Sequence, residues 1–458
     1  MSRFELEVSS DGVVAISGRE GRFTRRSRVR VDGRVLDRHL SHHFAGLLAD
    51  LVDVGMAAYA ADRLCPRPRR RNRYDHFWHR RIHITLPVRT PERWGEPEVR
   101  HHLQDVLAFL TEDDWTFDFV PRAAGPREVQ GQLFDPRPSP PLTTCLFSRG
   151  LDSVAGLTRE LRAAPDTTFV LFGGYTHPRL AKVQRELACA LQADFGARIR
   201  FVQVPFGIRH ETHSYNADDR TQRSRGFAHG LLGSAIAIAS GGDSLRCYEN
   251  GVGALNLPLT DAQLGAQNAR SAHPVAAEKL AHLVRLITGR PFRIELPCIF
   301  ETKASMCRPM RGTTLEDLVP STVSCDSFPL RIRGKTQCGH CSSCVLRRQA
   351  LRVAGLSAYD PPEPYRYDLH DAGSWNDAAV TYPMSAMLYQ VAQLQAALGS
   401  GDPWYTLSRT FPRLEQTVLS LAKWGWNAEE TRAGILRLYS TYCDEWDGFA
   451  QQSLTFAA

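Results

Sequence analysis

The sequence lacks any long hydrophobic run. No window approaches the roughly 18 uncharged apolar residues that a membrane-spanning helix requires. The opening residues, MSRFELEVSSDGVVAISGRE, carry charge throughout and contain no apolar core of the kind that a signal peptide needs. Internal repeats and long low-complexity tracts are absent too. We therefore expect a soluble, cytoplasmic protein that binds no membrane.

A disulfide framework is also absent. The chain has 11 cysteines, an odd number, and four of them gather near one another in the sequence: Cys325, Cys338, Cys341 and Cys344. The other seven stand apart: Cys65, Cys145, Cys189, Cys247, Cys298, Cys307 and Cys443. This pattern favours zinc in a reducing compartment over disulfides. Four thiolates leave no open position for water, so the spacing predicts a structural zinc ion.

Three regions follow one another along the 458 residues. Residues 1–138 mix strand-like alternation with helices, and we expect an α+β domain that ends at the proline-rich linker 135–141. Residues 139–370 alternate short strands and helices, which predicts an α/β domain with a mostly parallel, doubly wound sheet. Residues 371–458 have helical periodicity, and the pattern suggests no chemistry there.

The segment SRGLDS, residues 148–153, is the strongest candidate for a phosphate loop. An apolar strand candidate precedes it and a helix-like segment follows it, so backbone N–H groups and a positive helix end would face a phosphate. Ser148 and Ser153 supply hydroxyl groups, Gly150 permits close approach of the backbone, and Asp152 can orient a metal ion. The segment has no Walker lysine, which points away from kinases and GTPases.

In a doubly wound sheet the ligand lies at the carboxyl ends of the strands. This rule places the SRGLDS loop, Gly173-Gly174, residues 205–210 and residues 249–251 around one crevice. A nucleotide site is the prediction.

Arginines and aromatic residues crowd residues 63–81. Guanidinium groups beside aromatic rings suit phosphate contact and base stacking, so a nucleic acid is one candidate partner. We favour the alternative, a solvated basic loop or a docking surface for an acidic protein, because nothing else in the chain resembles a nucleic-acid-binding module.

SRGLDS resembles the SGGLDS signature of PP-loop ATP pyrophosphatases. Downstream, Thr302-Lys303, Ser324-Cys325 and CGHCSSCVLRR at 338–348 are similar to the 7-cyano-7-deazaguanine synthase (QueC) family. Residues 223–239, 248–265 and 271–274 resemble still more closely the QueC-like proteins of bacterial anti-phage operons, the Qat system and type IV CBASS. The QueC resemblance covers about 142–355, and the flanking regions match only the defence-type proteins.

The resemblance implies a PP-loop fold and a ligase that cleaves ATP to AMP and pyrophosphate. Queuosine-pathway members adenylate the carboxylate of 7-carboxy-7-deazaguanine, let ammonia attack, and dehydrate the amide to the nitrile with a second ATP. By this resemblance the phosphates would lie against Ser148, Arg149, Gly150, Leu151, Asp152 and Ser153. Asp152 would lie near Mg²⁺, while Arg223, Arg225 and Lys303 would neutralise the leaving pyrophosphate.

Two questions stay open at the level of sequence. Glu249, Asn250 and Asp261 are candidates for reading the base, because its N–H edge favours a carboxylate acceptor; Glu249 could instead pair with an arginine. The acceptor is either ammonia or an amine of a partner protein from a defence operon, and the large flanking regions favour the protein.

Arg149 departs from the family, whose second glycine stands at this position. It could add charge for pyrophosphate, or it could crowd the loop. The second alternative would leave a nucleotide-binding pseudoenzyme, and we favour an active enzyme.

Overall fold

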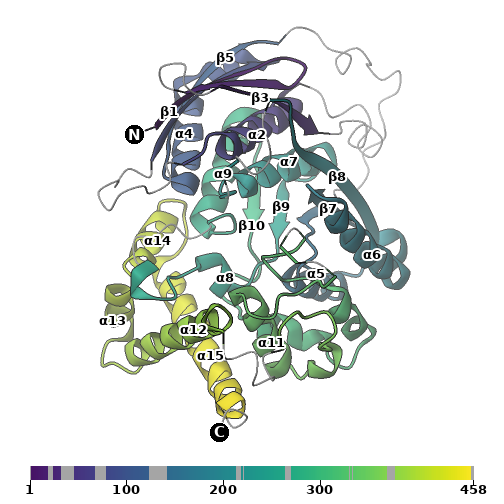
Figure 1. Ribbon diagram of the computed structural model, residues 1–458, viewed down its shortest axis with the longest axis vertical. Helices are drawn as coiled ribbons and strands as arrows, with labels where there is room; N and C mark the ends of the chain where they lie inside the picture. The colour runs from purple at the N-terminus through teal and green to yellow at the C-terminus, as the bar shows by residue number, and fades with distance from the viewer. Residues whose placement is uncertain are drawn as a thin grey trace.

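The computed structural model describes most of the chain (Figure 1). The described residues are 2–18, 24–31, 46–67, 79–122, 142–212, 218–219, 221–263, 270–329, 331–332, 334–368 and 377–454. Among them, no helix combines the length and the apolar character that crossing a membrane would take. The linker expected at 135–141 and the arginines of residues 69–73 lie outside the described residues.

One ten-stranded sheet runs through the molecule. Its spatial order is β10 (Arg293–Glu295), β9 (Ser244–Cys247), β6 (Thr143–Leu146), β7 (Phe169–Tyr175), β8 (Ile199–His210), β3 (Thr24–Val31), β2 (Val13–Gly18), β1 (Ser2–Val8), β4 (Arg80–Val88) and β5 (Asp114–Pro121). The half from β10 to β8 is parallel throughout. In the other half, the pairs β8–β3, β3–β2 and β2–β1 are antiparallel, and the pairs β1–β4 and β4–β5 are parallel. The predicted α/β class with a largely parallel sheet is confirmed.

Strand β8 belongs to both halves of the sheet. Its first part, residues 199–205, pairs in parallel with β7, and its second part, residues 206–210, pairs antiparallel with β3. The twelve residues of β8 span about 40 Å at roughly 3.3 Å per residue. The strands of the N-terminal region therefore extend the parallel sheet of residues 139–370 through β8.

Helices cover both faces of the parallel half. Successive residues of a strand point to opposite faces, so Val170 and Phe172 of β7 join one apolar cluster while Phe169 and Leu171 join the other. The first cluster is completed by α7 (Arg225–Ala239) and α9 (Pro274–Thr288), the second by α5 (Leu151–Ala163) and α6 (Pro178–Phe195). Burial on both faces explains why these strands are almost wholly apolar.

Three helices accompany the N-terminal strands: α2 (Leu47–Leu64), α3 (Pro91–Gly95) and α4 (Pro97–Thr111). Helix α2 packs directly on α7, and a Cβ atom at Gly55 would lie 3.3 Å from Cα of Ala228. The absence of that atom lets the two helices approach closely. The apolar periodicity predicts helices near 42–61 and 98–110; α4 agrees with the second to within one residue at each end, whereas α2 begins at Leu47 and ends at Leu64.

The C-terminal region is helical, as predicted: α12 (Ala378–Leu398), α13 (Pro403–Thr410), α14 (Arg413–Ala422) and α15 (Ala428–Leu454) (Figure 1). The periodicity of residues 403–424 predicts a single helix there, and this prediction is wrong. Phe411 leaves helical geometry and Pro412 has no N–H to donate, so two helices form. The predicted cap at Asn427 is confirmed, since its Oδ1 accepts from the backbone N–H groups of Glu429 and Glu430.

Candidate functional site

The SRGLDS loop connects the end of β6 to the start of α5. Ser148 Oγ accepts from the Gly150 N–H at 3.0 Å and lies 3.1 Å from Ser153 Oγ, which donates to the Gly150 carbonyl at 2.9 Å. These bonds fix a tight turn around Gly150. No side chain caps the N-terminus of α5, so the N–H groups of its first turn are available to an anion.

A buried charged centre lies beside this loop. Lys303, the first residue of α10 (Lys303–Cys307), places Nζ 2.5 Å from Oδ2 of Asp152 in the first turn of α5. Asn250, which follows β9, directs Nδ2 to Oδ2 of Asp152 at 3.5 Å and to Oε1 of Glu249 at 2.9 Å. Four residues predicted from sequence therefore meet at the carboxyl ends of β6 and β9.

The charges in this centre shift one another. Burial raises the pKa of Glu249 to about 8, and the neighbouring Asp152 carboxylate adds to the rise. Burial works to lower the pKa of Lys303, but the carboxylates of Asp152 and Glu249 outweigh it, and the net shift is upward. The centre thus holds a cationic lysine, an ion-paired aspartate and a glutamic acid that keeps its proton near neutral pH.

One oxygen of the centre receives no hydrogen bond from a nitrogen or hydroxyl group of the described residues. It is the buried Oδ1 of Asp152, and the protonated carboxyl group of Glu249 shares a hydrogen bond with the same carboxylate. Buried carboxylate oxygens are almost always paired or bound to a metal. Asp152 could therefore hold a divalent cation such as Mg²⁺ through Oδ1 while Oδ2 stays on Lys303.

Arg149 turns its side chain toward the cysteine segment. Its Nη2 donates to the carbonyl of Cys325 at 3.3 Å, its guanidinium lies 5.4 Å from the ring centre of Phe328, and its own carbonyl accepts from the N–H of Val323 at 2.8 Å. Burial and, after it, the charge of Arg225 lower the pKa of Arg149 to about 10. This direction is the one expected for a buried cation that lacks a close carboxylate partner.

Arg223, just before α7, and Arg225, its first residue, lie in different surroundings. Arg225 is exposed and its charge acts on Arg149, so it belongs to the surroundings of the loop. Burial lowers the pKa of Arg223 to about 10, and the charges that act on it next are those of Arg67 and Glu112. The structure therefore brings Arg223 to the N-terminal region. Asp261 accepts from Tyr389 of α12 at 2.8 Å, on the C-terminal helices.

The four clustered cysteines come together as the spacing predicts. The sulfur atoms of Cys325, Cys338, Cys341 and Cys344 all lie within 4.8 Å of one another, which suits one metal ion. The N–H groups of Ser327 and Cys338 donate to Sγ of Cys325 at 3.3 and 3.2 Å, an arrangement that stabilises thiolate. The set of four sulfur donors fits Zn²⁺. Arg149 contacts Cys325, one of the four cysteines, so the cysteine cluster lies against the SRGLDS loop.

The C-terminal region contributes a residue to this centre that was not predicted from the sequence. Glu445 of α15 is 5% exposed, and its Oε1 accepts from Oγ1 of Thr302 at 2.8 Å. Thr302 caps α10, because its Oγ1 also accepts from the N–H of Ser305. Glu445 therefore holds the residue directly before Lys303. In sequence it is one acidic residue within a long helix, and no local signal marks it.

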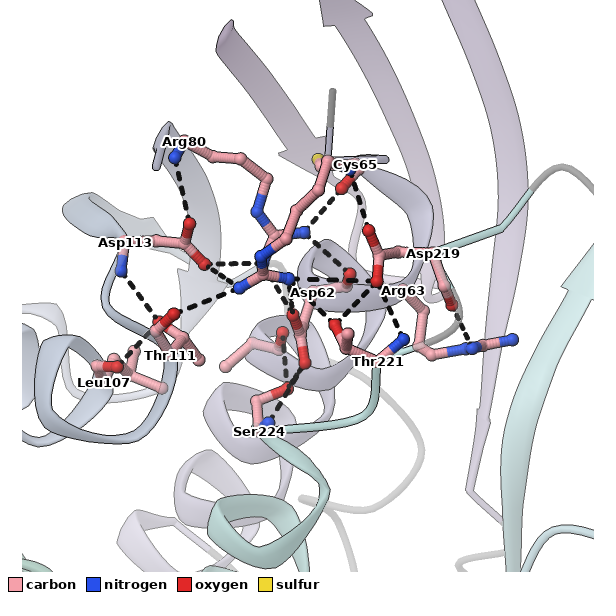
Figure 2. Close-up of polar contacts among 12 residues, drawn as sticks. Asp62, Arg63, Cys65, Arg80, Leu107, Thr111, Asp113, Asp219, Thr221 and Ser224 are labelled. Atoms are coloured by element: carbon pink, nitrogen blue, oxygen red, sulfur yellow. Dashed lines mark hydrogen bonds and ion pairs between the residues drawn. The ribbon is translucent and has the colours of Figure 1, made fainter. Parts of the chain in front are cut away.

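The basic segment at 63–81 is partly buried. Arg63, Arg67 and Arg80 are at most 7% exposed. Figure 2 shows Arg80 between Asp62 and Asp113, and its Nη2 lies 2.6 Å from a carboxylate oxygen of each. Arg67 pairs with Asp113 at 2.6 Å. These three arginines belong to an internal ion-pair network, so they are not available to either candidate partner of this segment, a nucleic acid or an acidic protein.

With this geometry in place, the comparison with known families becomes informative. The family model for the queuosine biosynthesis protein QueC matches residues 271–355. The matched segment contains Lys303 and all four clustered cysteines, and the SRGLDS loop precedes it. No curated protein matches the chain. The match supports a QueC-like enzyme of the ligase or synthase type that uses ATP in nucleotide-related chemistry, with four cysteines that could hold a zinc ion.

Proposed function

We propose that the chain adenylates the carboxylate of a 7-deazaguanine and then transfers the acyl group to an amine, forming an amide. The carboxylate oxygen attacks the α-phosphorus of ATP, and pyrophosphate leaves; the amine then attacks the acyl carbon, and AMP leaves. A carboxylate alone is a poor electrophile because oxide would have to leave, whereas AMP is a good leaving group. The observation that carries the proposal is the Asp152–Lys303 pair beside the uncapped N-terminus of α5.

Each residue around the loop has a place in this proposal. The N–H groups at the start of α5 and the hydroxyls of Ser148 and Ser153 would hold the phosphates. Asp152 would orient Mg²⁺ through its buried Oδ1. Lys303 would stabilise the negative charge that builds as pyrophosphate leaves, assisted by Arg225 at the edge of the site. In this reading the PP-loop fold is the scaffold, and the zinc ion is structural.

Glu249 and Asn250 are the proposed readers of the base. The Watson–Crick edge of a deazaguanine presents N–H donors, and an ionised Glu249 would accept from them. Because the pKa of Glu249 is about 8 in the chain alone, binding of those donors would favour the charged form and release a proton.

The proposed acceptor is an amine of a partner protein, in an anti-phage defence system. Two large regions flank the QueC-like part, and a small nucleophile such as ammonia needs no extra surface. One flank also reaches the centre, through the contact of Glu445 with Thr302. With ammonia as the acceptor, the product would instead be a free amide or nitrile.

The test is a reaction with ATP, Mg²⁺ and 7-carboxy-7-deazaguanine, with ammonia or each protein encoded beside this chain as acceptor. We expect AMP and pyrophosphate, and a mass increase on one partner protein equal to the acyl group. Asp152→Asn should abolish pyrophosphate release while the protein stays folded. ADP and phosphate as products would rule out adenylation, and a low-molecular-mass amide or nitrile formed with ammonia alone would make the acceptor ammonia.

A further inference from the structure

A small cavity lies where the central and C-terminal regions meet. Its polar lining comes from Asn256, from Arg270 and His273 ahead of α9, and from Arg413 and Thr417 of α14. Helix α8 (Gly251–Leu255) begins directly after Asn250 and ends at this cavity. Its five residues span about 7.5 Å. The cavity is thus one short helix away from the charged centre, and no step described above uses its residues.

Positive charge exceeds negative charge at this cavity. Arg270 contacts Oε1 of Glu112 at 3.0 Å, and Arg413 approaches the same oxygen at 3.9 Å. Within the described ranges, Glu112 is the one carboxylate that pairs with either arginine. Two guanidinium groups therefore share a single carboxylate, and a second anion would complete the pairing.

His273 is a neutral part of the lining. Its Nδ1 accepts from the N–H of Val275 at 3.3 Å, which leaves the proton on Nε2, 3.4 Å from Oγ1 of Thr417. Burial, with the charges of Arg270 and Arg413, lowers the pKa of His273 to about 3. The imidazole stays neutral at physiological pH and its N–H is engaged with Thr417, so His273 adds no positive charge to the cavity.

We propose that this cavity, of about 20 Å³, takes up an oxygen of a ligand's oxyanion, a phosphate or a carboxylate, between Arg270 and Arg413. Both groups accept bidentate hydrogen bonds from a guanidinium, and both would supply the missing negative charge. Arg413 comes from the C-terminal region, so the site exists only when that region is docked. The inference stands on the cavity alone and does not require the adenylation reaction.

The experiment is a thermal-unfolding titration at constant ionic strength, with inorganic phosphate in one arm and acetate in the other. We expect a saturable rise in Tm, in the phosphate arm for a phosphate ligand or in the acetate arm for a carboxylate ligand. Arg413→Gln should weaken that response at least tenfold, and Arg413→Lys, which keeps the charge but loses the planar fork, should give an intermediate value. Arg409→Gln, an exposed position on the neighbouring helix, should leave the response unchanged.

The phosphate loop could also bind phosphate, so Asp152→Asn is titrated in parallel. A response that changes in Asp152→Asn and stays unchanged in Arg413→Gln would assign the anion to the loop and overturn the proposal. A response in neither arm, or one that Arg409→Gln reduces as much as Arg413→Gln does, would overturn it too.

Discussion

Glu249 is the residue whose ionisation the fold alters most usefully. Its ordinary pKa of 4.5 rises to about 8 through burial and through the nearby Asp152. Between these two pH values the folded chain keeps a proton that the unfolded chain has released. The stability that this group provides is therefore complete below about pH 4.5 and declines as the pH rises toward 8.

Replacing Glu249 with glutamine should remove this loss of stability with rising pH. Relative to the wild-type chain, we expect the free energy of unfolding of Glu249→Gln to increase by on the order of 1 kcal/mol between pH 5 and pH 8, after allowance for solvent at this half-buried group. Urea unfolding at several pH values measures this free energy. Glu186→Gln, an exposed substitution on α6, is the control. Parallel stability curves for Glu249→Gln and the wild type would show that Glu249 is ionised in the folded chain.

A second prediction concerns the contribution of Arg149 to ATP binding. Its guanidinium has one hydrogen bond of 3.3 Å and a buried Nε without a partner, so a bound phosphate would improve its surroundings. We expect Arg149→Gly to weaken ATP binding by roughly 1.5 to 3 kcal/mol, as measured by calorimetry with a non-hydrolysable analogue. Arg149→Lys should restore part of the loss. Tighter binding or faster turnover in the glycine variant would show instead that the arginine obstructs the loop.

Single residues also show what sequence can and cannot place. Asp152 and Lys303 are 151 residues apart, yet the family resemblance assigned both to one phosphate site, and in the structure they form an ion pair. Arg223 and Arg225 looked equivalent, but a separation of two residues at the start of a helix turns the two side chains in different directions. Glu445 could not be found, because its role arises only when α15 packs against Thr302.

Among the elements, the cysteine segment was the most predictable. Ligand spacing is a local property, so the sequence alone specifies which thiols can share a metal. The break between α13 and α14 was missed, although Pro412 lies in the sequence, because the apolar periodicity continues across it. Local periodicity reports a buried face, and it does not report whether one helix or two supply that face.

We expect one zinc ion per chain and a large loss of stability when a ligand is removed. Cys338→Ser should lower the free energy of unfolding by about 4 kcal/mol or more, because three remaining thiolates would close the site poorly. Metal analysis and denaturant unfolding give the two values. Cys189→Ser, at an exposed thiol on α6, should change neither. A chain with no zinc, or a Cys338→Ser variant as stable as Cys189→Ser, would contradict a structural metal site.

In the molecule as a whole, the N-terminal region and the central region, residues 139–370, share a sheet and a buried ion network. Asp62 at the end of α2 accepts from Arg80 and Arg67 through Oδ1, and from the N–H and hydroxyl of Ser224 before α7 through Oδ2. Sequence predicted two domains with a linker between them. It could not predict that β3 would pair with β8, because antiparallel pairing between distant strands leaves no local pattern.

Removing the Asp62 carboxylate should therefore affect both regions at once. In Asp62→Ala, Arg80 and Arg67 stay buried but lose one of the carboxylates that they share. We expect the free energy of unfolding to fall by about 3 to 5 kcal/mol. Hydrogen exchange followed by mass spectrometry should show faster exchange in β3 and in β8 together. Asp114→Ala, which removes a carboxylate exposed on β5, is the matched control. Faster exchange confined to the N-terminal strands would show that the two halves of the sheet open independently.

The double pairing of β8 restricts how this chain can change over generations. The change of partner falls between Pro205, opposite Tyr175, and Phe206, opposite Val31. One inserted residue at that point would turn every later side chain of the strand to the opposite face and move Phe206 out of the core. Insertions and deletions should therefore be excluded from the middle of β8 among homologues, while the loops on either side vary freely in length.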